Sequence, residues 1–292
     1  MGRLTKRVLL PLLLGGVVIF ACVASSSDDS SGDGSSSAGS SKEGSLQRRL
    51  TYFPVEELAM TPAQAGLDGW DVTLTTDDGL ELAAWWFPAP NARGAVILCH
   101  GNGGNRSYAL PLAQRFLKRG FCVLNYDYRG YGGNPGTPSE NGLRADARAA
   151  FDYVEKRAFD PSRVLVHGHS LGCAVAIALA AERPVGAVIV ENGFTSLADI
   201  GSEAYSWLPA RALVGNTWNN VERIEQVEAP IFVAHARDDE MIDGAHSERL
   251  AELAGALLYE YPGDHNSSCL FRSETPELDA FLDEHFPVEG PR

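Results

Sequence analysis

Ser170 lies at the centre of residues 168–172, which read G-H-S-L-G. The apolar residues 164–166 precede this pentapeptide and the Ala-rich residues 173–182 follow it, which predicts a strand, a sharp turn and a helix. Such a turn strains the backbone of the central serine and exposes its hydroxyl above the sheet, while the glycines let strand and helix approach closely. The segment therefore predicts a nucleophile elbow, whereas the pentapeptide alone would also fit a chance Gly-Ser-Gly turn.

A second glycine-rich turn, residues 100–105 (H-G-N-G-G-N), follows directly after the apolar residues 95–99. Glycines at a strand end let backbone N–H groups point into a cleft, where they can stabilise a developing oxyanion. A mobile loop and a phosphate cradle are the alternatives for this loop. The chain lacks the G-x-x-x-x-G-K-[S/T] pattern, which argues against a nucleotide site.

Two later apolar runs are each followed by side chains that can move or orient a proton. Residues 231–234 lead through His235 to the acidic residues 238–240, and residues 257–261 lead to His265 in the sequence G-D-H-N. A histidine can take the proton of a serine hydroxyl, and a carboxylate can hold the imidazole in the required tautomer. The chain thus offers serine, acid and histidine in the order that follows a nucleophile elbow.

The elements that must position these residues alternate regularly along the chain. The expected strands span residues 71–76, 80–87, 95–99, 121–126, 163–166, 185–190, 231–234 and 257–261. The expected helices span residues 108–118, 142–156, 173–182, 245–253 and 276–285. The first two strands are joined by D-D-G, which predicts a hairpin. The alternation predicts a mostly parallel central sheet of about eight strands, with helices on both faces and an antiparallel start.

The ordered set of H-G-N-G-G-N, D-Y-R-G-Y-G (residues 127–132) and the elbow resembles the α/β-hydrolase superfamily over residues 70–286. More narrowly, it is similar to the compact, lid-poor serine hydrolases that include ABHD-type and prolyl-oligopeptidase-like sequences. The resemblance implies the α/β-hydrolase fold. For residues 127–132 we favour a structural turn, which packs aromatic side chains and pairs Arg129 with an acid, over a role in shaping the pocket floor.

The resemblance implies a catalytic triad of Ser170, Asp239 and His265. The family pattern H-G-x-x-D at this strand end maps onto Asp239, with Ala236 in place of the usual glycine. Asp238 is the alternative acid.

The resemblance also implies an oxyanion hole made by the backbone N–H groups of Asn102 and Leu171. Leu171 begins the expected helix after the elbow, where free N–H groups and the positive end of the helix dipole favour negative charge.

A metal site formed by Asp238, Asp239, Asp243 and His246 is a weaker interpretation, because their spacing matches no known cage. We expect no metal and no cofactor. We expect structural roles for the other histidines, which are His100, His167, His169, His235, His246 and His285.

The formal net charge of −14 argues against a nucleic-acid partner, because no basic stripe is available to neutralise phosphates. The same charge would repel anionic membrane surfaces, so membrane attachment requires a hydrophobic or covalent anchor.

Residues 1–22 have the features of an export signal: a basic start followed by an apolar core over residues 8–20. The sequence I-F-A-C at residues 19–22 resembles the lipobox of bacterial lipoproteins, with Cys22 as the lipidated residue and Phe20 bulkier than usual. We therefore expect an exported, membrane-anchored lipoprotein. The alternatives are cleavage near Ala24, which would give a secreted or periplasmic protein, and an uncleaved anchor.

Residues 23–49 are dominated by Ser, Gly and Asp and predict a disordered linker that acts as a tether. The catalytic domain is expected over residues 50–292. Within it, residues 195–228 predict a small cap whose short helices bring aromatic side chains toward an acyl group. The alternative is that these helices pack their apolar faces on the body of the domain.

The remaining cysteines need a separate interpretation, because an exported protein can form disulfides. Cys99 and Cys122 lie in apolar runs and are expected to be buried, inert thiols. A bridge between Cys173 and Cys269 stays open as an alternative.

These observations predict a serine hydrolase that cleaves carboxylic esters or acyl thioesters through an acyl-enzyme on Ser170. Its expected substrates are small-molecule or lipid esters, and its expected membrane contact is the N-terminal lipid anchor. Two alternatives remain: a serine peptidase of prolyl-oligopeptidase-like type, and a non-catalytic binding module with a hydrolase fold.

Overall fold

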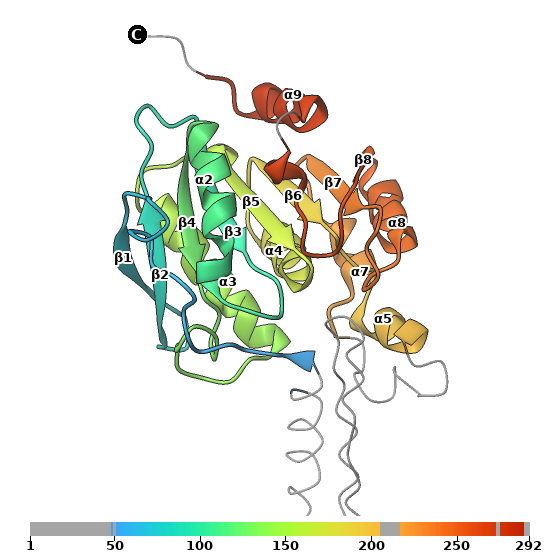
Figure 1. Cartoon of the computed structure of the whole chain (residues 1–292), viewed down its shortest axis with the longest axis horizontal. Helices are drawn as coiled ribbons and strands as arrows, with labels where there is room; N and C mark the ends of the chain where they lie inside the picture. Colours follow the sequence, from blue (N-terminus) through green and yellow to red (C-terminus); the bar gives the residue numbers. More distant parts are fainter. Residues whose placement is uncertain (1–47, 49–50, 205–216, 273–274, 289–292) are drawn as a thin grey trace, which may run out of the picture.

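A central eight-stranded sheet organises the computed structural model, which describes residues 48, 51–204, 217–272 and 275–288 (Figure 1). The strand order is β1-β2-β4-β3-β5-β6-β7-β8. The strands are β1 (Trp70–Thr75), β2 (Glu81–Phe87), β3 (Gly94–Cys99), β4 (Phe121–Tyr126), β5 (Val164–His169), β6 (Ala187–Glu191), β7 (Ile231–Ala236) and β8 (Leu258–Tyr261).

The first strands pair differently from the others. β1 is antiparallel to β2, and β2 is antiparallel to β4. Every other neighbouring pair, from β4 across to β8, is parallel. The predicted fold class, including its antiparallel start, is therefore confirmed. Parallel pairing places the carboxyl ends of β3, β5, β6, β7 and β8 at one edge, which is where the side chains of interest follow.

Helices cover both faces of the sheet (Figure 1). They are α2 (Leu110–Lys118), α3 (Glu140–Glu155), α4 (Leu171–Glu182), α5 (Leu197–Ala204), α7 (Asn220–Ile224), α8 (Gly244–Ala254) and α9 (Pro276–His285), with 3-10 turns at Arg106–Ala109, Pro161–Arg163 and Cys269–Phe271. Apolar residues of α2 and α9 belong to one core cluster, and those of α3, α4 and α8 belong to the other.

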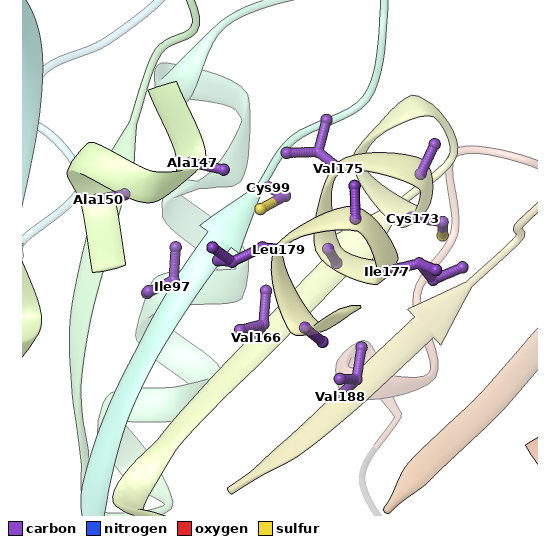
Figure 2. Packing of buried hydrophobic residues seen from close by; sticks show 14 of the residues in the cluster. Ile97, Cys99, Ala147, Ala150, Val166, Cys173, Val175, Ile177, Leu179 and Val188 are labelled. Carbon is purple, nitrogen blue, oxygen red and sulfur yellow. The ribbon is translucent and has the colours of Figure 1, made fainter. Parts of the chain in front are cut away.

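The helix behind the elbow is the most deeply buried of these elements. Every residue of α4 from Leu171 to Ala180 is buried, as expected for a helix that is apolar on all sides. Figure 2 shows its side chains against β3, β5 and β6, where Ile97, Val166 and Val188 point toward it. Because successive strand residues face opposite ways, Val96 and Leu165 belong to the other core cluster. The elbow therefore lies between a central strand of the sheet and the most deeply buried helix.

The predicted cap is only partly within the described residues. α5 and α7 lie inside the range of residues 195–228, and residues 205–216 lie outside the description. Trp218 is fully buried in the main core, and its Nε1 donates a hydrogen bond to Tyr52 Oη at 3.0 Å. This side chain thus packs on the body of the domain.

The predicted signal and linker, residues 1–49, also lie outside the description apart from residue 48. None of the helices within the described residues is long and apolar enough to span a membrane.

Candidate active site

The turn between β5 and α4 has the backbone that a nucleophile elbow requires. Ser170 has φ 55° and ψ −121°, a left-handed conformation that is unusual for a residue with a Cβ. A Cβ at position 172 would collide with the carbonyl oxygen of Cys99, and one at position 168 would collide with the backbone of Gly172. The two glycines are therefore needed for the close approach of β3, β5 and α4.

Ser170, His265 and Asp239 form one hydrogen-bonded chain. His265 Nε2 lies 2.9 Å from Ser170 Oγ, and His265 Nδ1 lies 2.7 Å from Asp239 Oδ2. With Nδ1 protonated, the imidazole donates to the carboxylate and leaves Nε2 free to accept the serine proton. The structure thus brings together the three side chains that the sequence assigns to the triad.

The surroundings of Asp239 keep its carboxylate ionised. Burial raises its pKa, but the hydrogen bond and charge of His265 outweigh burial, so the pKa of Asp239 lies below its usual value. Its Oδ1 also accepts backbone N–H groups from Met241 at 2.8 Å and Ile242 at 2.9 Å. The neighbouring Asp238 is exposed, and the carboxylate that contacts His265 is that of Asp239.

The glycine-rich loop after β3 lies directly against the elbow. A Cβ at position 101 would be 3.6 Å from Ser170 Cβ, so Gly101 is in van der Waals reach of Ser170. Asn102 is the next residue of this loop. Leu171 is the first residue of α4, where a backbone N–H has no acceptor within its own helix. The glycine-rich loop and the start of α4 therefore both border Ser170, and the role of the Asn102 and Leu171 N–H groups as oxyanion donors stays a prediction.

Glu191, the last residue of β6, is a buried carboxylate that we did not predict. Its Oε2 lies 3.1 Å from His167 Nε2 and accepts from Ser268 Oγ at 2.8 Å, while Oε1 accepts from Cys269 N at 2.6 Å. Burial raises its pKa, but the hydrogen bond and charge of His167 outweigh burial and lower it to about 2. Glu191 thus holds the segment that follows His265.

Asn192, the next residue, holds His265 itself. Its Nδ2 donates to the carbonyl oxygen of His265 at 3.0 Å, and its Oδ1 accepts from the N–H of Ala236 at 2.8 Å. His169 Nε2 lies 2.8 Å from the same carbonyl oxygen. Burial and the nearby His265 lower the pKa of His169 to about 4, so it is neutral at pH 7 and can donate this bond.

The end of β6 carries a sequence signal for the support by Glu191. Residues 187–191 read A-V-I-V-E, so an acidic residue ends an otherwise apolar strand. A buried carboxylate requires hydrogen-bond partners, and His167 on the neighbouring strand is one of them.

The residues of the weaker metal interpretation have separate partners. Asp243 accepts the N–H of Ala245 at the start of α8, and His246 contacts Thr195 Oγ1 and Glu203 Oε2 at 2.8 and 2.9 Å. Among the described residues, no group of three His, Cys, Asp or Glu side chains could hold a metal ion.

The four cysteines among the described residues are free thiols. Cys99, Cys122, Cys173 and Cys269 are all buried, and the alternative bridge between the last two is absent from the structure. Burial raises the pKa of the Cys99 thiol to about 12, which fits the prediction of an inert side chain.

The turn at residues 127–132 has the structural role that we favoured. Arg129 Nη2 lies 2.7 Å from the buried Asp146 Oδ1 and its Nη1 lies 2.7 Å from Asp78 Oδ2. The rings of Tyr128 and Tyr131 pack edge to face, with their centroids 5.6 Å apart.

Comparisons with known proteins agree with this fold. The chain matches the α/β-hydrolase fold family over residues 94–218. A Mycobacterium tuberculosis protein, described as uncharacterized, is 43% identical over 213 residues, which cover 72% of this chain and 76% of the relative. The α/β-hydrolase domain-containing protein WAV2 of Arabidopsis thaliana is 32% identical over 251 residues, covering 78% of this chain and 79% of the relative.

Among solved structures, a Pyrococcus furiosus esterase superposes with a TM-score of 0.65 at 21% identity, covering 81% of this chain and 98% of the esterase. The chain belongs to the α/β-hydrolase fold family.

Proposed function

We propose that the protein is a serine hydrolase that cleaves carboxylic esters or acyl thioesters through an acyl-enzyme on Ser170. The observation that carries this proposal is the hydrogen-bonded chain from Ser170 Oγ through His265 to Asp239. Membership of the α/β-hydrolase fold family and the fold likeness to an esterase support it.

The chemistry follows from these contacts. Ser170 Oγ attacks the acyl carbon while its proton passes to His265 Nε2, and the carbonyl oxygen becomes an oxyanion. The N–H groups of Asn102 and Leu171 would stabilise that oxyanion, because donors fixed in advance need no reorganisation during the reaction. The C–O or C–S bond then breaks, and the leaving group takes the proton from His265.

Deacylation repeats the same steps with water as the nucleophile. Water gives a proton to His265 Nε2 and attacks the acyl carbon, and the proton returns to Ser170 Oγ as the acid product leaves. In both steps the ionised Asp239 stabilises the imidazolium form of His265. The lowered pKa of Asp239 matters because it keeps this carboxylate ionised.

Two alternatives have distinct signatures. A serine peptidase of prolyl-oligopeptidase-like type would cleave amides efficiently, and a non-catalytic module would react with no acylating probe. Matched p-nitrophenyl esters and p-nitroanilides of the same acyl group separate the first alternative. The unbroken hydrogen bonding from Ser170 through His265 to Asp239 argues against a non-catalytic module.

We further propose that the protein is exported and anchored to a membrane by a lipid on Cys22. The lipobox-like residues 19–22 and the Ser/Gly-rich linker support this, and they would place the domain near small-molecule or lipid esters. Mass spectrometry of the native N-terminus tests it. A mass corresponding to lipidated Cys22 is expected, whereas a mature chain that begins beyond residue 22 would refute it.

The catalytic proposal is tested with Ser170→Ala and p-nitrophenyl butyrate. Turnover should vanish in this variant, and Ser162→Ala serves as the matched control because Ser162 is exposed and outside the site. Esterase turnover that persists in Ser170→Ala would refute the proposal.

A further inference from the structure

Residues 51–59, here called the N-terminal arm, run along residues 101–107, here called the oxyanion loop. Pro54 and Gly104 form a parallel bridge between the two segments. The arm lies far from the loop in sequence, and the hydrogen bonds that join them span 48 to 51 residues. The contact is thus a tertiary one, at the edge of the sheet that carries Ser170.

The side chain of Asn102 binds the arm on both sides of Tyr52. Its Nδ2 donates to the carbonyl oxygen of Thr51 at 2.7 Å, and its Oδ1 accepts the N–H of Phe53 at 3.1 Å. The same Oδ1 accepts from Tyr131 Oη at 2.7 Å. A side-chain amide with donor and acceptor both engaged has little rotational freedom. The residue proposed as an oxyanion donor is therefore fixed by the arm and by the hydroxyl of Tyr131.

Asn105 and Ser107 continue the same contact. Asn105 Nδ2 donates to the carbonyl oxygens of Val55 at 3.1 Å and Glu57 at 2.8 Å. Ser107 Oγ accepts the N–H of Ala59 at 3.0 Å and donates to Asn105 Oδ1 at 2.6 Å. Both side chains are almost fully buried, with 1% and 2% exposure. Three polar side chains of the loop thus bind every second backbone unit of the arm.

The arm is held through its backbone, because most of its side chains face solvent. Residues 54–57 are exposed, whereas Tyr52 is buried and accepts the hydrogen bond from Trp218 Nε1. The N–H of Gly132 also donates to the carbonyl oxygen of Val55 at 3.0 Å. The contact therefore depends on where the arm backbone lies.

We propose that the N-terminal arm positions the oxyanion loop, with the side chains of Asn102 and Asn105 as positioning residues for the backbone N–H of Asn102. The inference rests on the proposed hydrolase function. The loop contains Gly101, Gly103 and Gly104, the last with φ 138°, so its own sequence gives it wide conformational freedom. An oxyanion donor acts only within about 2.7–3.1 Å of the developing charge, and the hydrogen bonds to the arm restrain the loop in addition to the bond from Tyr131 Oη.

The test uses two full-length variants, Asn102→Ala and Asn105→Ala. Each removes side-chain hydrogen bonds to the arm and keeps the backbone N–H at position 102. Glu56→Ala is the matched control, because Glu56 is an exposed arm residue. Fluorophosphonate titration counts the intact sites of each variant, so that kcat is expressed per titrated site. A boronic acid, which forms a tetrahedral adduct with serine, reports on the oxyanion hole as a transition-state analogue.

We expect Asn102→Ala to lower kcat per site by about 10- to 100-fold with KM unchanged, since small misplacement of a catalytic group costs up to about 10². The boronate inhibition constant should rise in the same proportion as kcat/KM falls. Asn105→Ala should show a smaller loss with the same pattern, and Glu56→Ala should match the wild type.

Unchanged kcat per site in both asparagine variants, whatever their thermal stability, would overturn the inference. That outcome is distinguishable from failure of the proposed function, in which Ser170→Ala would retain wild-type turnover. Loss of titratable sites with normal kcat at the remaining sites would show that the arm serves stability alone, and would also overturn the inference.

Discussion

Two loops meet at Ser170, and the protein holds them by different means. The loop that carries His265 is fixed from the interior by Glu191 and Asn192 at the end of β6. The oxyanion loop is fixed to a distant part of the chain, because its Asn102 and Asn105 side chains bind the backbone of the N-terminal arm. The base thus depends on a buried charge, and the oxyanion donor depends on a distant chain segment.

The difference has an energetic meaning. Removing a buried charge leaves its partners desolvated and without a hydrogen bond, so support from the interior is coupled to folding of the whole domain. The amide-to-backbone bonds of the arm contact are neutral and contribute about 1 kcal/mol each, because their removal leaves no buried charge unpaired. We therefore expect damage to the first support to lower stability, and damage to the second to lower turnover.

The largest expected effect concerns the acid that orients the base. Asp239→Asn should lower kcat by about 10⁴-fold, because an amide at this position favours the wrong imidazole tautomer. Asp238→Asn is the matched control and should retain wild-type turnover of p-nitrophenyl butyrate. The reverse ranking of these two variants would mean that Asp238 is the acid.

The interior support is tested by Glu191→Ala. The change leaves His167, Ser268 Oγ and the N–H of Cys269 without their acceptor, so the free energy of unfolding should fall by about 3–5 kcal/mol. Urea midpoints measure this loss. Glu191→Gln keeps an acceptor oxygen and should lose less. If Glu191→Ala lowers the free energy of unfolding by no more than Asn105→Ala does, the distinction between the two supports is wrong.

Asn192 links the interior support to catalysis. Its φ is 54°, which glycine adopts without strain, so Asn192→Gly removes the bonds to Ala236 and His265 and keeps the backbone. We expect kcat to fall by about 10-fold through misplacement of His265. Asn192→Ala should show the same loss of kcat with an added loss of stability of about 1 kcal/mol. Wild-type kcat in both variants would contradict this role.

The remaining prediction is a pH dependence of stability at His169. Its folded pKa of about 4 lies below the ordinary value of 6.5, so the unfolded chain binds a proton that the folded protein does not. Its contribution is fully present above pH 6.5 and is lost as the pH falls toward 4. The Glu191 contribution has the same sign and is lost below about pH 4.5.

Urea midpoints between pH 7 and pH 4 should therefore decrease for the wild type and decrease less for His169→Asn, which carries no titratable group. Equal slopes for the two proteins would contradict the assignment to His169.

The strand and helix segments, the mostly parallel sheet with its antiparallel start and the elbow could be predicted because they rest on local patterns: apolar runs, helix-forming stretches and the two glycines around Ser170. His265 and Asp239 could be placed because each follows a recognisable late strand. The supports were hidden for different reasons. Glu191 accepts hydrogen bonds from Ser268 and Cys269, which lie 77 and 78 positions further along the chain. Only the folded sheet brings these residues to Glu191.

The contact of the arm with the oxyanion loop could not be predicted, because the arm takes part through its backbone atoms. Backbone atoms are the same in every residue, so the sequence does not indicate which of them bind. For Trp218, hydrophobicity predicted burial but could not tell whether the ring would face a substrate or the core. The structure places it in the core, against Tyr52.

The most direct test of the catalytic claim is the location of a covalent adduct. The folded protein is treated with a fluorophosphonate and digested, and the modified peptide is sequenced by tandem mass spectrometry. We expect one adduct per chain, on Ser170, formed in step with the loss of esterase turnover and absent from Ser170→Ala. An adduct on another residue, or full turnover after stoichiometric labelling, would contradict it.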